Sequence, residues 1–176
     1  NGVFTITGSG TDIWGTADSF GFVYAALDGN GEVFLRVSSL QNTNPFAKVG
    51  LMLRDSLDPS SANVILDLRP TGDIEFMSRA TAGADAVYLA GASSNFPVYL
   101  WLLRDGSTVT AYYTTSGGQN TRIGSTTIAL GHRLLVGVAD PQHQVVLPMA
   151  PGHAQAYGKA VAGEAAGHGH GRQSGQ

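Results

Sequence analysis

Three aromatic side chains are the residues of this sequence best suited to holding a ligand. Tyr99 and Trp101 alternate along one apolar stretch, and Tyr112 lies in the next stretch. The dipeptide Asp105-Gly106 separates the two, and Asp-Gly between apolar stretches is a strong signal for a β-hairpin. A two-residue turn at this dipeptide places Tyr99 opposite Tyr112, with Trp101 two residues along on the same face.

Aromatic rings can cover the C–H faces of pyranose sugars, while charged side chains hydrogen-bond the sugar hydroxyls. Arginines and lysines occupy the non-core positions of several other predicted strands. They join the aromatic rings if all these strands share one curved sheet. The predicted ligand-binding residues are Tyr99, Trp101, Tyr112, Arg36, Lys48, Arg54 and Arg79. The alternative is that these side chains pack under a loop or against a neighbouring domain.

Asp67 and Glu75 form a second constellation, on one face of neighbouring predicted strands. A three-residue loop at positions 71–73 is the preferred connection, and it places Leu68 opposite Phe76. Two carboxyl groups could cleave glycosides if they lie about 5–5.5 Å apart (retaining) or 6.5–9.5 Å apart (inverting). Nearby arginines can neutralise both carboxylates, which favours structural ion pairs over catalysis.

Metal ligation is the third chemistry considered. Asp12 and Asp18 flank Trp14 in a predicted loop and are the candidate ligands of a structural calcium ion. No other cofactor is predicted. The chain has no cysteine, so neither a disulfide nor a catalytic thiol is available.

Short strands must position these groups. The stretch 47–56 alternates Ala47, Val49, Leu51 and Leu53 with a set of cationic, glycine and methionine residues, which is the pattern of a strand with one core face. Glycine is frequent, at 24 residues, and only 13% of residues are charged, as expected of short strands joined by glycine turns. The sequence therefore predicts an all-β protein. The residues expected between its sheets include Val49, Leu51, Leu53, Leu66, Leu68, Phe76, Leu100 and Leu102.

Length and charge restrict the partners. A chain of 176 residues is one domain with a real core, and a net charge of −3 argues against nucleic acid or an anionic membrane as partner. No apolar run approaches the roughly 20 residues of a membrane span. Residues 140–176 are rich in alanine, glycine, histidine and proline and lack a structural period, so we expect them to be poorly ordered. The domain is therefore predicted to cover residues 1–139. A chain that opens at Asn1, without a start methionine or a signal peptide, is expected of a mature or excised fragment.

Several motifs resemble a bacterial concanavalin A-like domain family, sometimes labelled regulation-of-enolase-like. They are Asp12-Ile-Trp-Gly-Thr-Ala-Asp-Ser-Phe, Gln41-Asn-Thr-Asn, Ala47-Lys-Val-Gly-Leu-Met-Leu-Arg-Asp-Ser and the hairpin around Asp105-Gly106. The resemblance covers residues 1–139 and implies a jelly-roll sandwich of two antiparallel sheets, usually one module of a secreted multidomain protein. Trp101 stands where such domains commonly carry arginine. After Ala139 the family continues into a closing strand that residues 140–176 do not match.

Together these observations predict a non-catalytic module that binds a polysaccharide or glycan, or mediates adhesion. The expected setting is a secreted or cell-surface bacterial protein. Two alternatives stay open: a glycoside hydrolase-type enzyme that uses Asp67 and Glu75, and a structural spacer domain.

Overall fold

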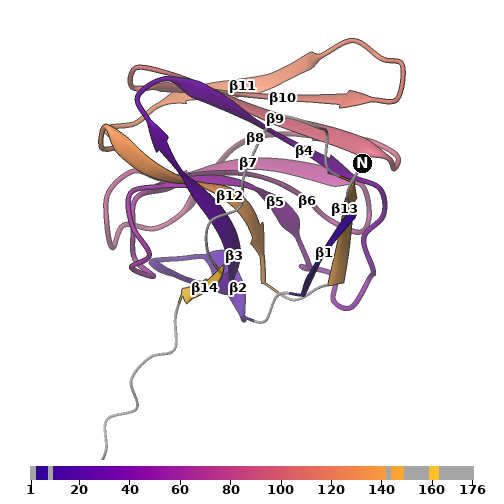
Figure 1. The fold of residues 1–176 in the computed structure, drawn as a ribbon, viewed down its shortest axis with the longest axis horizontal. Coiled ribbons are helices and arrows are strands. Elements are labelled where there is room, and N and C mark those ends of the chain that lie inside the picture. The colour runs from indigo at the N-terminus through magenta and orange to yellow at the C-terminus, as the bar shows by residue number, and fades with distance from the viewer. Residues whose placement is uncertain (1–2, 8–9, 142–143, 149–158, 163–176) are drawn as a thin grey trace, which may run out of the picture.

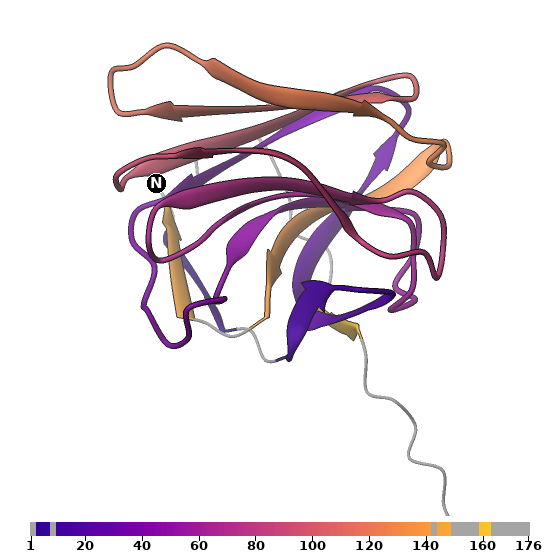
Figure 2. The same ribbon diagram turned by 180° about the vertical axis from the view of Figure 1, so that it is seen from behind.

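The chain folds into two stacked antiparallel sheets and a small additional ladder. The computed structural model describes residues 3–7, 10–141, 144–148 and 159–162, and in these residues the regular elements are all strands. The four-stranded sheet lies above the larger one in Figure 1, and Figure 2 shows the same two layers from behind. The predicted all-β sandwich of two antiparallel sheets is confirmed.

The larger sheet has eight strands. In spatial order they are β14 (Lys159–Ala162), β3 (Ala17–Asp28), β12 (Arg133–Asp140), β5 (Val49–Arg54), β6 (Asn63–Leu68), β7 (Asp73–Arg79) and β8 (Val87–Ser93), and β2 (Asp12–Trp14) pairs with the first part of β3. Figure 1 shows β3 and β12 at the front, and β7 and β8 come to the front in Figure 2.

The smaller sheet runs β11 (Thr121–Thr127), β10 (Thr108–Thr115), β9 (Val98–Asp105) and β4 (Gly31–Val37). A separate two-stranded ladder joins β1 (Val3–Thr7) to β13 (Gln144–Pro148). Strands β13 and β14 belong to the segment predicted to be poorly ordered, and most of that segment lies outside the described residues.

The main core fills the space between the two sheets because the strands alternate as the sequence predicts. All eight predicted core residues are buried. Apolar residues of β4, β9 and β10 close this core from the side of the smaller sheet. The alternation therefore determined which face of each strand turns inward.

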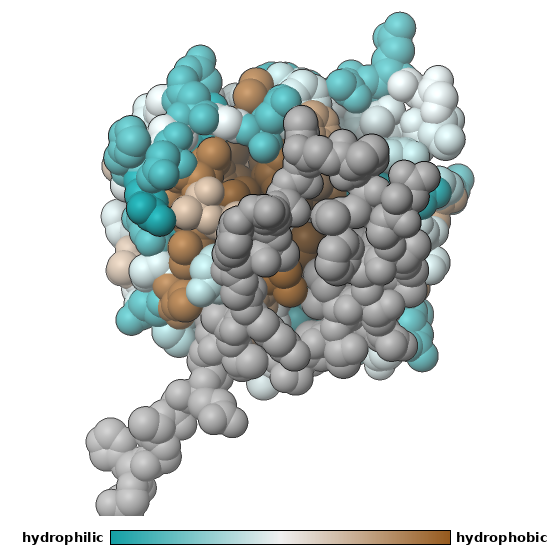
Figure 3. Space-filling view, viewed as in Figure 1, coloured by the Kyte–Doolittle hydropathy of each residue, from teal (hydrophilic) through white to brown (hydrophobic). Residues whose placement is uncertain are grey.

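A second cluster on the outer face of the larger sheet was not anticipated. Its buried members are Ile13, Phe20, Phe22, Met52, Ile65, Met77 and Ala139. The β2–β3 hairpin folds over this face, so both faces of β5 and β6 are buried. The buried members of this cluster are not visible at the surface, and the brown, apolar residues near the centre of the view in Figure 3, where β3 and β12 lie, are other, more exposed residues. Strand β8 was also not predicted.

Leu51→Ala tests the main core. Leu51 is fully buried, and truncation of a core leucine to alanine removes packing and leaves a cavity, so the free energy of unfolding should fall by about 2–5 kcal/mol. Leu57, which is exposed, provides the control, because the same change there should cost less than about 0.5 kcal/mol. Urea unfolding measures both values. Equal effects at the two positions would contradict the assignment of the core.

Candidate functional site

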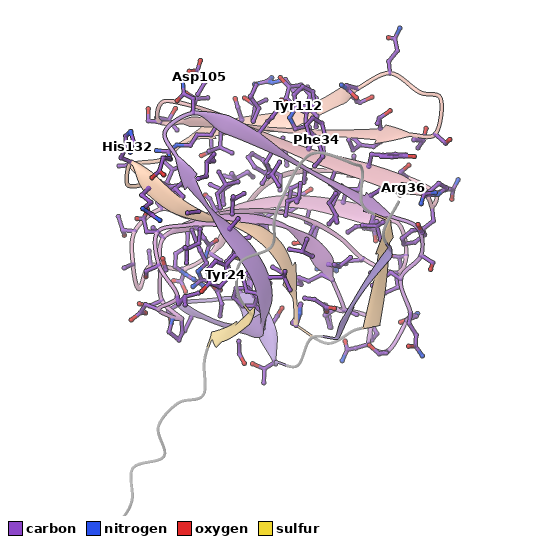
Figure 4. All side chains as sticks on the ribbon, in the orientation of Figure 1. Tyr24, Phe34, Arg36, Asp105, Tyr112 and His132 are labelled. Atoms are coloured by element: carbon purple, nitrogen blue, oxygen red, sulfur yellow. The ribbon has the colours of Figure 1, made fainter. Side chains whose placement is uncertain are left out.

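A row of aromatic rings crosses the outer face of the four-stranded sheet. Phe34 of β4 pairs with Trp101 of β9, which pairs in turn with Tyr112 of β10. The ring centroids of Phe34 and Trp101 lie 5.1 Å apart at 18°, and those of Trp101 and Tyr112 lie 4.5 Å apart at 24°. Figure 4 shows Phe34 and Tyr112 close together on this sheet. The three rings therefore form one continuous stack.

The sequence placed these residues on the correct face but in the wrong register. Trp101, not Tyr99, lies opposite Tyr112, because the turn residues are Gly106 and Ser107 instead of Asp105 and Gly106. Gly106 has a φ of +58°, and glycine at the first turn position is typical of type II′ hairpins. A shift of the pairing by two residues leaves every side chain on its original face.

The side chain of Asn30, in the connection between β3 and β4, binds this turn. Its amide nitrogen donates to Asp105 Oδ1 at 2.8 Å, and its Oδ1 accepts from the Gly106 backbone N–H at 2.7 Å. This clamp sets the register of the β9–β10 hairpin and so aligns the aromatic row.

The stack determines which ring faces a ligand can reach. Trp101 has Phe34 on one side and Tyr112 on the other, so both faces of its indole are covered. Its Nε1–H is buried and has no hydrogen-bond partner in the part of the chain that the structure describes, which costs stability. Phe34 is 54% exposed and lies on the edge strand β4, so its outward face is free. The alternation of Val33, Leu35 and Val37 with Phe34 and Arg36 in the sequence predicts this face for Phe34. Phe34 is nevertheless not among the predicted ligand-binding residues.

Arg36 and Tyr99 form the next row of the same face. The Arg36 Nε donates to the Tyr99 hydroxyl at 3.1 Å, and its Nη1 donates to Ser38 Oγ at 2.6 Å. The guanidinium also lies over the Tyr99 ring, 5.6 Å from its centroid. These contacts hold one cationic group beside the aromatic row, farther along β4 from Phe34 in Figure 4.

The other predicted cations do not belong to this face. Lys48, Arg54 and Arg79 lie on the larger sheet or just before it, and all three are buried. The assumption that these strands share one curved sheet with β9 and β10 is wrong. The structure therefore divides the predicted ligand-binding residues, and only Arg36, Tyr99, Trp101 and Tyr112 come together.

Arg79 and Arg54 instead surround a buried carboxylate, that of Asp18. Arg79 binds both carboxylate oxygens at 2.8 and 2.6 Å, and Arg54 Nη1 lies 3.4 Å from Oδ2. Asn63 donates to the same oxygen at 3.0 Å. Arg79 also donates to the carbonyl oxygen of Gly15 in the β2–β3 turn. Burial lowers the pKa of Arg54, and the proximity of Arg79 lowers it further, whereas Asp18 opposes this shift.

Asp12 and Asp18, the candidate calcium ligands, are both engaged by cations. Asp12 Oδ1 lies 3.0 Å from Lys48 Nζ. Within the described residues no cluster of three or more histidine, aspartate or glutamate side chains could hold a metal ion. The arrangement therefore favours ion pairs that attach β2 and β3 to the sheet.

Asp67 and Glu75 are direct cross-strand partners on the outer face of the larger sheet. The loop comprises residues 70–72, one position earlier than predicted, so Leu66, not Leu68, lies opposite Phe76. Gly72, with a φ of +89°, completes this loop, and its N–H donates to the Arg69 carbonyl oxygen at 2.9 Å. Again the shift is two residues, and the faces are unchanged.

The two carboxylates have different environments. Glu75 Oε2 accepts a hydrogen bond from Arg69 Nε at 2.9 Å and lies 2.9 Å from Arg69 Nη2. Asp67 is fully buried, and among the described residues neither of its carboxylate oxygens has a hydrogen-bond partner. Burial raises the pKa of Asp67 to about 7; the negative charge of Glu75 adds to this rise, and Lys48 opposes it more strongly. No substrate reaches the Asp67 oxygens in this arrangement.

Comparison with known proteins identifies the fold of the chain but not its family. No family model matches the chain, and no curated protein matches it in sequence. A functionally unknown protein from Saccharomyces cerevisiae has a similar structure, with a TM-score of 0.61 and 12% identity over 82% of this chain and 81% of that one. The carbohydrate-binding module CBM66 from Bacillus subtilis is similar with a TM-score of 0.56 and 14% identity, over 84% of this chain and 92% of the module.

A variant of the GH43 protein BlXynB from Bacillus licheniformis is also similar, with a TM-score of 0.51 and 16% identity over 71% of this chain. The match spans only 26% of that protein's length. These likenesses show that the chain has the concanavalin A-like jelly-roll fold that its motifs imply. Within the described residues no helix is long and apolar enough to span a bilayer.

Asp18→Ala should strongly destabilise the protein. Removal of one partner of a buried ion pair leaves uncompensated charge, here on Arg54 and Arg79, at a cost of about 3–5 kcal/mol. Asp28→Ala is the matched control, because the Asp28–Arg133 pair is exposed and 4.0 Å long and should contribute at most about 1 kcal/mol. Chemical denaturation compares the two variants. A small cost for Asp18→Ala would show that the network does not hold the hairpin.

Asp67→Asn should change the pH dependence of stability. The folded state raises the pKa of Asp67 to about 7, so between about pH 4 and 7 it holds more protons than the unfolded chain. The free energy of unfolding of the parent protein should therefore fall as the pH rises through this window. Asparagine has no proton to lose, so the variant's advantage should grow from near zero at pH 4 to at most about 4 kcal/mol at pH 8. Parallel stability curves from urea unfolding would refute the buried, unpaired state of Asp67.

Proposed function

We propose that the protein is a non-catalytic carbohydrate-binding or adhesion module that binds a polysaccharide or glycan at the aromatic row. The observation that carries this proposal is the free ring face of Phe34, held upright by its stack on Trp101. A rigid ring with one exposed face and a supported back is a suitable platform for the C–H face of a pyranose.

The neighbouring polar groups suit the rest of a sugar. Arg36 is fixed by Tyr99 and Ser38, so it can donate to sugar hydroxyls with little loss of side-chain freedom. Trp101 and Tyr112 serve as support and present ring edges. The likeness to a carbohydrate-binding module is compatible with this role but is a likeness of fold alone.

We further propose that the chain is a member of the bacterial concanavalin A-like family that its motifs resemble. In that case the module belongs to a secreted or cell-surface multidomain protein. The motifs of residues 12–20, 41–44 and 47–56 support this membership. The structural spacer remains the alternative without a ligand.

Glycoside cleavage through Asp67 and Glu75 is less well supported. Glu75 is held by Arg69, and the Asp67 oxygens are covered. A general acid must come within hydrogen-bond reach of the glycosidic oxygen. The exposed Phe34 platform therefore favours binding over turnover.

Phe34→Ala tests the proposed platform. Loss of the exposed ring should weaken glycan binding by at least about 1 kcal/mol, or roughly fivefold in Kd, with little change in folding stability. A glycan array would select the ligand, and calorimetry would measure its affinity. Turnover of the same polysaccharides would be assayed in parallel.

Two further variants separate binding from packing. Trp14 is an exposed aromatic residue outside this sheet, and Trp14→Ala should leave the affinity unchanged. Trp101→Ala should lower both affinity and melting temperature, because Trp101 supports Phe34 from behind. Unchanged affinity in a folded Phe34→Ala protein would exclude the aromatic row as the site.

A further inference from the structure

A second exposed ring lies on the opposite side of the sandwich, on the edge strand β8. The hydroxyl end of Tyr88 occupies the space that a side chain at position 91 would fill. A Cβ at Gly91 would collide with the Tyr88 hydroxyl oxygen and lie 3.2 Å from Cζ. Tyr88 is nevertheless 51% exposed. The ring therefore lies against the strand over a glycine and keeps one face open.

A β-bulge produces this arrangement. In a regular strand Tyr88 and Gly91, three residues apart, would point to opposite faces. The pairing of β7 with β8 shifts between Phe76 and Met77, so Tyr88 pairs with Met77 while Gly91 pairs with Glu75. Both therefore belong to the outer face of the larger sheet. Bulges commonly re-aim a side chain in this way.

Polar groups continue from the Tyr88 ring across the sheet. Glu75 is the cross-strand partner of Gly91, and Arg69 binds only its Oε2 atom, at 2.9 Å. Arg69 therefore does not engage Glu75 Oε1. The side chains of Glu75 and Arg69 are 16% and 24% exposed, so solvent reaches both.

A further aromatic ring closes the far end of this band. The Arg69 guanidinium lies 5.4 Å from the centroid of the Phe46 ring, and Phe46 is 64% exposed. The band thus runs from Tyr88 over Glu75 and Arg69 to Phe46. Strands lie about 4.8 Å apart, so the distance from β8 to β6 is roughly 10 Å.

We infer that this band, formed by Tyr88, Gly91, Glu75, Arg69 and Phe46, is a second binding site for a neutral oligosaccharide. The Tyr88 face accepts a pyranose ring, and Glu75 Oε1 accepts a hydrogen bond from a sugar hydroxyl. Arg69 neutralises the Glu75 carboxylate, so the ion pair has no net charge and suits an uncharged ligand. This surface is separate from the aromatic row of the four-stranded sheet, and its occupancy does not depend on that site.

Packing alone explains the position of Tyr88 but not the other features of this band. An aromatic ring over an edge glycine also protects that strand, which would account for the position of Tyr88. It does not require the solvent-exposed Glu75–Arg69 pair or the second ring on Arg69 beside it. An open ring face, a carboxylate oxygen that Arg69 does not engage and a flanking ring together supply the apolar surface and the polar groups that ligand sites combine.

The test is an NMR titration of the ¹⁵N-labelled chain with maltohexaose, cellohexaose, xylohexaose and laminarihexaose. Binding at the proposed site should shift amide resonances of β7 and β8, and Tyr88→Ala should weaken the affinity derived from these shifts at least fivefold. Val87→Ala is the matched control on the same strand, because Val87 is similarly exposed, and it should leave the affinity unchanged. Glu75→Gln, which keeps a hydrogen-bond acceptor, should weaken binding less than Tyr88→Ala.

The outcomes also separate the two sites. Shifts in β7 and β8 that survive Phe34→Ala and disappear in Tyr88→Ala support the second site, even if the aromatic row binds nothing. Shifts confined to β4, β9 and β10, no response to any of the four sugars, or equal losses in Val87→Ala and Tyr88→Ala would overturn it. Self-association through β8, detected by sedimentation velocity and abolished by Tyr88→Ala, would likewise overturn it in favour of contact with a second copy.

Discussion

The arrangement of the larger sheet depends on the buried ion pairs that the Asp18 carboxylate forms with Arg54 and Arg79. Arg54, Asn63 and Arg79 form one cross-strand row on β5, β6 and β7, and Asp18 approaches that row from the β2–β3 hairpin. A charge pair removed from water is costly unless its geometry is nearly complete. Here Arg79 meets both oxygens, and its other donors satisfy backbone carbonyls of the adjoining loops. These contacts attach the hairpin to the larger sheet.

Closure by the hairpin determines which parts of the two outer faces stay exposed. The hairpin brings Ile13, Phe20 and Phe22 onto the outer face of the larger sheet and so forms the second apolar cluster. That cluster ends at Met77, whose partner across the strand pair is Tyr88. Beyond it the outer face opens toward β8, while the outer face of the four-stranded sheet stays open at Phe34. The two exposed regions thus lie on opposite layers of the sandwich.

Period-two alternation was sufficient to predict the main core and the orientation of Trp101, Tyr112, Asp67 and Glu75. It was not sufficient for register, because a shift of two residues preserves every face and changes every partner. In both hairpins the observed pairing differs from the predicted pairing by two residues. Gly106 occupies the first turn position in one hairpin, and Gly72 has a left-handed backbone conformation in the other. The local sequence pattern also does not show which of the two sheets a strand belongs to. The assignment of Arg36 to one sheet and Arg54 to the other follows from long-range pairing, which no short window of sequence contains.

The same limitation explains why the predicted ligand-binding residues included Trp101 but not Phe34. Trp101 has the largest ring of the row, yet its neighbours cover both faces, whereas Phe34 gains a free face from its place on the edge strand. Tyr88 gains its free face from a glycine and a bulge, two features that weaken a strand on their own. In both cases the exposed face is created by a neighbour: a ring behind Phe34 and a missing side chain beneath Tyr88. The exposure of an aromatic ring face in this sandwich is therefore determined by its cross-strand partners, and residue type alone does not predict it.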